Sequence, residues 1–176
     1  DEFNKQTDID TVAESWELSC HHDGQSIISN GEFSGKTLAQ YIETVGKQVI
    51  GTKAPKDKDF PILIKFNDAK QSLSVQVHPD DKYALLHEGE SGKTEMWYVM
   101  DATPDATLIY GFTHEISHQE FERRIKDNTL LEVCNQVPIK KGDVFFIEAG
   151  TLHAIGAGAL IAEIQQSSNS TYRVYD

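Results

Sequence analysis

Short apolar runs separated by turn-forming residues dominate the chain after its first third. Many of these runs alternate apolar and polar positions and are rich in β-branched or aromatic residues, which is typical of strands. The predicted strands are FPILIKF, LSVQV, EMWYVM, ATLIYGF, DVFFIEA, ALIAEIQQ and TYRVY. Gly, Pro, Asp or Asn residues lie between them, so the pattern predicts a mainly β domain that forms an antiparallel sandwich or barrel.

Helical periodicity is found in three segments. The first, GKTLAQYIETVGKQVIG, predicts one amphipathic helix with a stop at Gly51. Its apolar positions are Leu38, Tyr41, Ile42, Val45 and Val49. A short helix is predicted after Pro79, and a third begins where Ser117 and Glu120 have capping-box spacing. We expect the helices to pack outside the sheet.

One predicted strand carries polar side chains on one of its faces. In LSVQVHPDD, successive side chains point to opposite faces, so the apolar residues share one face. The other face receives Ser74, Gln76 and His78. This face is either the solvated side of a surface strand or the site of a chemical function.

The composition fits one domain that binds small molecules. The chain has 176 residues, of which 39% are hydrophobic, and this is enough apolar material for a single core. The net charge of −12 and the scattered basic residues argue against a nucleic-acid or anionic-membrane partner. A small phosphorylated substrate stays compatible with this charge, because a local pocket of Lys and Arg can oppose the net field.

The cysteine content and the hydropathy of the chain indicate in which cellular compartment the protein is expected. Cys20 and Cys134 are the two cysteines of the chain, and their separation predicts no disulfide framework. No apolar run is long enough to span a bilayer, and the first residues lack the layout of a signal peptide. We therefore expect a cytoplasmic protein without a membrane partner.

A hairpin near the end of the chain directs one histidine to the interior. In KKGDVFFIEAGTLHAIGAG, a turn leads into an apolar strand, Gly150 allows a tight bend, and a return strand carries His153. The spacing resembles the second cupin motif, with Gly142, Gly150 and His153 in place and Glu148 where that motif usually has proline. His153 is either a metal ligand or a hydrogen-bonded core histidine.

Donor side chains from separated strands complete a candidate metal site. Gln76 and His78 share a strand face, Glu95 opens the next strand, and His153 comes from the hairpin. Two nitrogen and two oxygen donors suit Zn²⁺ or another divalent ion with a coordination position left open. The alternative for Glu95 is a charged strand end beside Lys93.

Segments along nearly the whole chain carry a family resemblance. They are ESWELS, SLSVQVHPDD, GKTEMWYV, GDVFFIEAGTLHAIG and IAEIQQSSNSTYRVYD. In this order they resemble type I mannose-6-phosphate isomerase in its short bacterial form, a zinc enzyme of the cupin superfamily. The resemblance implies a cupin (jelly-roll-like) antiparallel β-barrel with a few peripheral α-helices. It also implies that residues 1–176 are a single cupin catalytic core, truncated at both ends relative to the full-length enzyme.

The resemblance assigns roles to nine residues. The family's zinc ligands, one ion per chain, fall on Gln76, His78, Glu95 and His153. Its active-site arginine, glutamate and lysine fall on Arg173, Glu163 and Lys93. Positions associated with the substrate phosphate fall on Ser74 and Lys65. For Lys65 the alternative is a charge that guards a strand edge.

The implied reaction is an aldose-ketose isomerisation. A proton moves between C1 and C2 of mannose 6-phosphate and fructose 6-phosphate through a cis-enediol. Glu163, Lys93 or a metal-bound water are the candidate proton acceptors, and their spacing in sequence does not choose among them. The rival interpretations are a metal-containing sugar-binding or sensing cupin without turnover, and an iron oxygenase that uses His78, Glu95 and His153 as a facial triad.

Two other histidines form a tempting pair. His21 and His22 are adjacent, and adjacent positions of a strand face opposite ways. We therefore interpret both as surface histidines.

Overall fold

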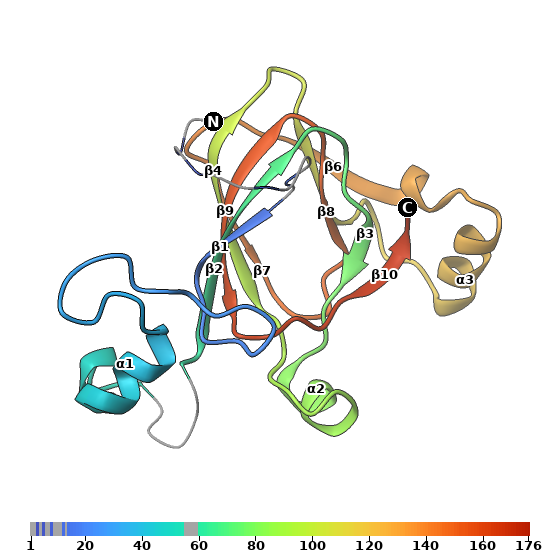
Figure 1. The fold of residues 1–176 in the computed structure, drawn as a ribbon. Helices are drawn as coiled ribbons and strands as arrows, with labels where there is room; N and C mark the ends of the chain where they lie inside the picture. The colour runs from blue at the N-terminus through green and yellow to red at the C-terminus, as the bar shows by residue number, and fades with distance from the viewer. Residues whose placement is uncertain (1–2, 4, 6–7, 9–11, 13, 55–59) are drawn as a thin grey trace.

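Two five-stranded sheets face each other in the computed structural model, which describes residues 3, 5, 8, 12, 14–54 and 60–176 (Figure 1). The first sheet has the order β1 (Glu14–Leu18), β2 (Ile62–Ala69), β9 (Ala159–Gln166), β4 (Glu95–Ala102), β7 (Val144–Ile147). The second sheet has the order β10 (Tyr172–Tyr175), β3 (Val75–Val77), β8 (His153–Ile155), β5 (Thr107–Phe112), β6 (Cys134–Pro138). Neighbouring strands are antiparallel throughout.

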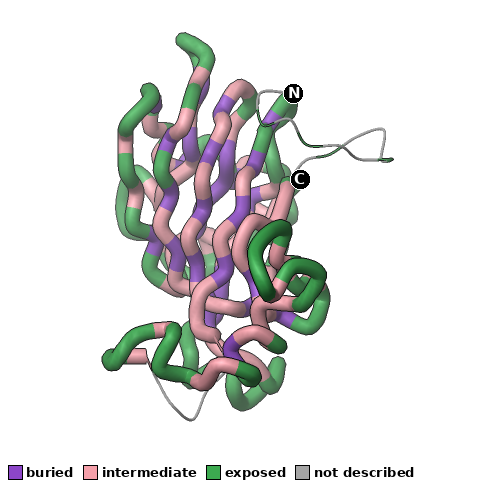
Figure 2. The backbone as a smooth tube through the Cα atoms, turned by 60° about the vertical axis from the view of Figure 1, so that its left-hand side comes forward, coloured by how far each residue is buried: buried purple, intermediate pink, exposed green. Residues whose placement is uncertain are grey.

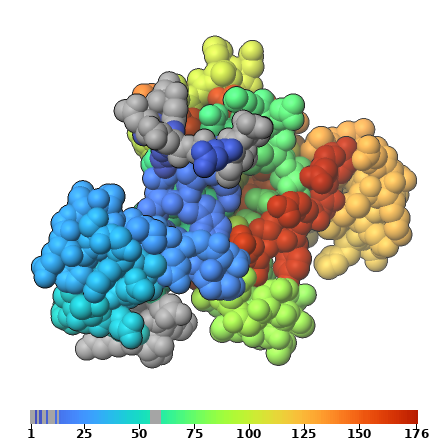
Figure 3. All heavy atoms as spheres, in the orientation of Figure 1, coloured from blue at the N-terminus to red at the C-terminus, as the bar shows by residue number. Residues whose placement is uncertain are grey.

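The mainly β prediction is confirmed, and each predicted strand is present. The two sheets have the jelly-roll-like arrangement that was predicted, and the barrel is not closed by hydrogen bonds, because no strand ladder joins the two sheets in the part of the chain that the structure describes. On one side the sheets end at β7 and β6, where the Tyr110 hydroxyl donates to the Phe146 carbonyl at 2.8 Å. On the other side they end at β1 and β10. The N-terminal residues in blue and the last strand in red meet on this face in Figure 3, and Asn169 donates to Asp23 there at 3.0 Å.

The helices lie outside the sheets, as predicted (Figure 1). They are α1 (Leu38–Val45), α2 (Asp81–His87) and α3 (His118–Lys126), with 3₁₀ turns η1 (Lys47–Ile50) and η2 (Leu130–Val133). The single helix expected up to Gly51 is wrong, because Gly46 has φ 102° and ends α1 there. Ser117 caps α3 by accepting from the Glu120 amide at 3.1 Å, as predicted. No helix among the described residues has the length and apolar character needed to cross a membrane.

Apolar side chains fill two separate volumes. One cluster lies between the sheets and joins Trp97, Val99 and Ile161 of the first sheet to Leu108 and Ile155 of the second. The other lies under α3 and η2, on the outer face of the second sheet. Buried positions alternate with less buried ones along β2 and β9, and Figure 2 shows such alternation along neighbouring strands. It directs one set of side chains of the first sheet into the space between the sheets.

Part of this interior is polar. The buried polar side chains of the strands and of the segments next to them include Lys65, Asn67, His78, Lys93, Glu95, His153, Glu163 and Gln165. Buried polar groups are unfavourable unless each finds a partner, so this concentration of them marks the candidate functional site.

Candidate metal centre

Three separate segments bring the predicted metal donors together. His78 directly follows β3, Glu95 opens β4, and His153 opens β8. Gln76 and His153 are register partners, so they project from the same face of the second sheet, while Glu95 reaches across from the first sheet. The amide of Gly150 donates to the His78 carbonyl at 2.8 Å and ties the two histidine segments together. Gly150 has φ 89°, which explains why the bend before His153 needs glycine.

The three donors converge on one point. His78 Nε2 lies 3.1 Å from His153 Nε2, and the two Glu95 oxygens lie 3.2 Å from His153 Nε2 and 3.5 Å from His78 Nε2. No more than 2% of the surface of any of the three residues is exposed. The alternative of Glu95 as a solvated strand end is therefore wrong.

The hydrogen bonds of the two imidazoles fix their tautomers. His78 Nδ1 lies 3.1 Å from the Ser170 carbonyl, and His153 Nδ1 lies 2.8 Å from the Thr151 carbonyl. A carbonyl oxygen only accepts, so each Nδ1 carries the proton and each Nε2 presents a lone pair. Both lone pairs point at the carboxylate of Glu95, whose two oxygens are buried and have no hydrogen-bond partner among the described residues.

This arrangement of acceptors fits a cation. Burial lowers the pKa of His78 to about 3, and the charge of Lys93 acts in the same direction. Burial also lowers the pKa of His153, so both imidazoles are neutral at pH 7. Three converging acceptors without a proton between them leave the Glu95 carboxylate without a hydrogen-bond donor among the described residues, and a divalent ion would fit between two imidazoles and this carboxylate. These residues therefore form a candidate metal site.

Gln76 lies at the border of this cluster. Its amide nitrogen is 3.5 Å from His153 Nε2. The amide group is planar and nearly symmetric in shape, so a half-turn brings its oxygen to the same place. Gln76 is thus within reach of the ion as a fourth donor.

A second polar cluster lies on the inner face of the first sheet. The Lys65 ammonium is 3.4 Å from Glu163 Oε1 and 3.2 Å from Glu14 Oε2, and Asn67 donates to Glu163 Oε2 at 2.8 Å. Burial and the charge of Glu95 raise the pKa of Glu163. Burial acts to lower the pKa of Lys65, but Glu163 and Glu14 outweigh it and the pKa is raised. Lys65 is buried on a strand paired on both sides, so its interpretation as an edge guard is wrong.

Lys93 connects the two clusters. Its side chain is buried, and its ammonium lies 3.4 Å from the Thr171 hydroxyl in the segment before β10. Burial lowers the pKa of Lys93, and the nearby charge of Lys65 lowers it further. A less basic ammonium exchanges its proton more readily near neutral pH.

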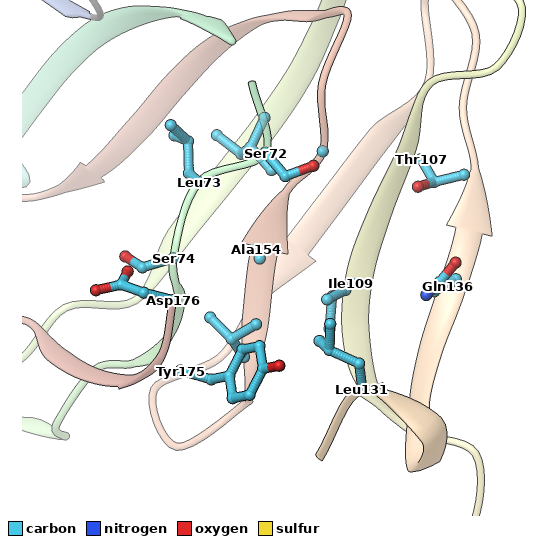
Figure 4. Close-up of a pocket in the computed structure, with 13 residues that line it drawn as sticks. Ser72, Leu73, Ser74, Thr107, Ile109, Leu131, Gln136, Ala154, Tyr175 and Asp176 are labelled. Atoms are coloured by element: carbon cyan, nitrogen blue, oxygen red, sulfur yellow. The ribbon is translucent and has the colours of Figure 1, made fainter. Parts of the chain in front are cut away.

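Arg173 and Ser74 lie further from the metal ligands. Arg173 is the register partner of Gln76 and therefore projects from the same sheet face, but it is exposed on the edge strand β10. Ser74 lines a pocket of about 350 Å³ together with Tyr175 and Asp176 (Figure 4). No lysine or arginine is among the residues that line this pocket, and no hydrogen bond among the described residues joins Ser74 to Lys65.

His21 corrects a sequence expectation. It is buried, with its Nε2 3.2 Å from a Glu90 oxygen, so its interpretation as a surface histidine is wrong, whereas His22 is exposed as predicted. Both lie in a turn rather than a strand, which is why their rings stack at 4.3 Å instead of facing opposite ways. Asp23 donates its amide to His21 Nδ1 at 3.2 Å, so that lone pair is already occupied.

Sequence patterns also missed polar residues of the interior. Asn67 and Gln165 were not singled out, although each has a register partner on the inner face of the first sheet. The available signal was the period of two along β2, which puts Asn67 on the same face as Lys65.

Comparisons with known proteins agree with this geometry. A family model described as phosphomannose isomerase type I, catalytic domain, matches residues 4–96. The probable mannose-6-phosphate isomerase GmuF of Bacillus subtilis is 45% identical over 100% of this chain and 55% of its own length. The mannose-6-phosphate isomerase of Streptococcus mutans is 45% identical over 99% of this chain and 54% of its own.

A solved structure shares the fold. The crystal structure of mannose 6-phosphate isomerase from Bacillus subtilis has a TM-score of 0.90 and 39% identity, and the match covers 99% of this chain and 55% of that one. This match supports the predicted jelly-roll type of the cupins. The chain spans just over half the length of the relatives that it matches.

Proposed function

The chain belongs to the type I phosphomannose isomerase family, and from this premise we propose that the protein interconverts mannose 6-phosphate and fructose 6-phosphate. The observation that carries the proposal is the buried convergence of His78, Glu95 and His153 beside ionisable Lys93 and Glu163. Residues 1–176 form the catalytic core in this proposal, and the similarity of the chain to named isomerases over nearly its whole length supports it.

The proposed ion is one Zn²⁺ per chain, held by Gln76, His78, Glu95 and His153. Two imidazole nitrogens and a carboxylate are a donor set that zinc proteins use in catalytic sites, where a further position stays open to water or substrate. When bound, the ion polarises the oxygens at C1 and C2 of the sugar and makes the neighbouring C–H bond more acidic.

Side chains beside the proposed metal site are assigned to proton transfer. The reaction needs a base at the carbon and charge stabilisation at the oxygens while the cis-enediol exists. Glu163 and Lys93 are the candidate proton carriers, because burial brings both pKa values closer to neutral, raising that of Glu163 and lowering that of Lys93. Arg173 is assigned to the developing negative charge, since a guanidinium is a cation with a planar set of donors.

The phosphate is assigned to Lys65 and Ser74. Lys65 offers a cation inside the fold, although it is engaged by Glu163 and Glu14 in this structure. We further propose a cytoplasmic protein whose partner is the small sugar phosphate and not a nucleic acid, in keeping with the net charge of −12.

Turnover of mannose 6-phosphate is the direct test. The intact protein that contains this chain is expected to form fructose 6-phosphate, to lose activity on chelation, and to regain it with Zn²⁺. Product is measured by a coupled assay, and bound metal by elemental analysis. Sugar-phosphate binding without any turnover in the zinc-loaded protein would favour the non-catalytic cupin, and full activity without bound metal would refute the metal assignment.

Solvent exchange tests the reaction type. In D₂O, we expect deuterium at C1 or C2 of the recovered sugar, because a side-chain base exchanges its proton with solvent during the lifetime of the enediol. NMR of the product after several turnovers measures the label. Product free of deuterium after prolonged reversal would count against proton transfer by an exchangeable base.

A further inference from the structure

Both oxygens of the Glu163 carboxylate are engaged in the interior. Oε1 faces the Lys65 ammonium at 3.4 Å, and Oε2 accepts from the Asn67 amide at 2.8 Å. All three residues are at least nine-tenths buried. The carboxylate is therefore held in one orientation by two donors from the neighbouring strand β2.

The two donors hold it in different ways. The contact with Asn67 has the distance of a good hydrogen bond, whereas the ammonium of Lys65 is shared with Glu14. Glu14 is itself held by the Trp16 indole at 2.9 Å and is partly open to solvent. A lysine on a flexible four-carbon stem, divided between two carboxylates, does not fix the direction of either one by itself.

Asn67 has no evident role in packing. It occupies an inward position of a strand that is paired on both sides, where an apolar residue is normal. Burying an amide there is unfavourable unless it is hydrogen-bonded, and the carboxylate of Glu163 supplies the bond. The hydrogen bond is charge-assisted, which makes it stronger than one between neutral groups.

We propose that Asn67 is a positioning residue that fixes the Glu163 carboxylate for proton transfer, independently of Lys65. This inference rests on the proposed isomerase function and on the place of Glu163 in it. Asn67 acts through Glu163 and does not itself touch the substrate. The orientation of Glu163 then survives any movement of Lys65.

Two substitutions separate this role from a structural one. Asn67→Leu keeps the number of heavy atoms and the branch at Cγ but removes the donor, and Asn67→Gln keeps a donor on a side chain that is one methylene longer. If Asn67 only fills space, Asn67→Gln, which adds a heavy atom to the interior, is the more harmful change. If it positions Glu163, Asn67→Leu lowers kcat about ten- to a hundredfold, with KM within about twofold, and Asn67→Gln recovers part of the loss.

The measurement uses the intact, zinc-loaded protein. For each variant, kcat, KM, bound metal and the melting temperature are determined. Asn135→Leu is the matched control, because it removes an amide that donates to the Tyr110 carbonyl at 3.3 Å on the second sheet. We expect it to leave kcat unchanged. Should Asn67→Leu not fold, Asn67→Ala removes the same donor and the same loss of kcat is expected.

The outcomes distinguish the two proposals. An active wild-type protein whose folded Asn67→Leu or Asn67→Ala variant keeps kcat within twofold refutes the role of Asn67 alone. A loss confined to KM, or a larger loss in Asn67→Gln than in Asn67→Leu, also refutes it. A metal-loaded wild-type protein with no isomerase activity refutes the proposed function, and this role with it.

Discussion

Replacing Glu95 with glutamine is expected to abolish most metal binding and isomerase activity while making the metal-free protein more stable. In the metal-free protein Glu95 is a buried carboxylate with no donor among the described residues, and such a charge is strongly unfavourable. Removing the charge should raise the free energy of unfolding by about 1–3 kcal/mol. Metal affinity should fall by more than the roughly ten- to hundredfold that follows the loss of an outer partner of a metal ligand.

Thermal melts with and without metal test whether Glu95→Gln stabilises the metal-free protein and removes the stabilisation by metal. Wild-type protein gains stability from the ion, by about 2.7 kcal/mol when free metal is a hundred times the dissociation constant. The Glu95→Gln variant should melt above the wild type in chelator and gain little from metal. If Glu95→Gln destabilises the metal-free protein, the carboxylate has a partner and the metal assignment is wrong.

Glu163→Gln is the matched control for this experiment. Glu163 is buried to the same degree in the same sheet, but its oxygens are held by Lys65 and Asn67. Neutralising it removes a partner of Lys65 but also removes the burial cost and the repulsion from Glu95 that raise its pKa, so the gain in stability should be smaller than for Glu95→Gln. Metal binding should persist, because Glu163 is not one of the converging donors.

Arg173→Ala is expected to cost about a hundred- to a thousandfold in kcat while sparing the fold and the metal. This is the usual effect of losing one preorganised donor to a developing oxyanion. Among the described residues, no hydrogen bond or ion pair is recorded for the guanidinium, and Arg173 is exposed, so stability should change little. Arg173→Lys should recover only part of the rate, because an ammonium does not reproduce the planar fork.

The control is an arginine without a proposed role. Arg123 is exposed on α3 and makes ion pairs with Glu120 and Asp127, so Arg123→Ala should leave kcat unchanged. Steady-state kinetics, substrate affinity and bound zinc are measured for the three variants. Near-normal kcat in Arg173→Ala would remove Arg173 from the catalytic assignment.

Part of the candidate metal site could be predicted from the sequence because successive side chains of a strand alternate between its two faces. Gln76 lies at an inward position of a short strand, His78 follows that strand directly, and a glycine bend delivers His153. Their convergence with Glu95 depends on which strands pair, and no local pattern supplies that information. The sequence therefore offered the grouping as a hypothesis, the family resemblance supported it, and the structure supplies a physical reason in the Glu95 oxygens, which have no hydrogen-bond partner among the described residues.

Local sequence patterns gave incomplete or wrong predictions where backbone conformation or contacts between distant residues determine the structure. The period of 3.6 continues through Gly46, but its positive φ ends α1. Closure of the barrel depends on how β1 and β10 approach each other, which strand propensity does not address. The burial of His21 follows from a contact with Glu90, which is 69 residues away in sequence.

The two imidazoles are oriented by carbonyl groups that lie at very different separations from them along the chain. His153 is aligned by Thr151 within its own turn, but His78 is aligned by a carbonyl 92 residues downstream, just before the last strand. On the ribosome, the first of these contacts forms at once, whereas the second waits for most of the domain to emerge and for a long loop to close. If the proposed ion binds here, firm binding requires that the segment with Ser170 has already joined the fold and aligned His78.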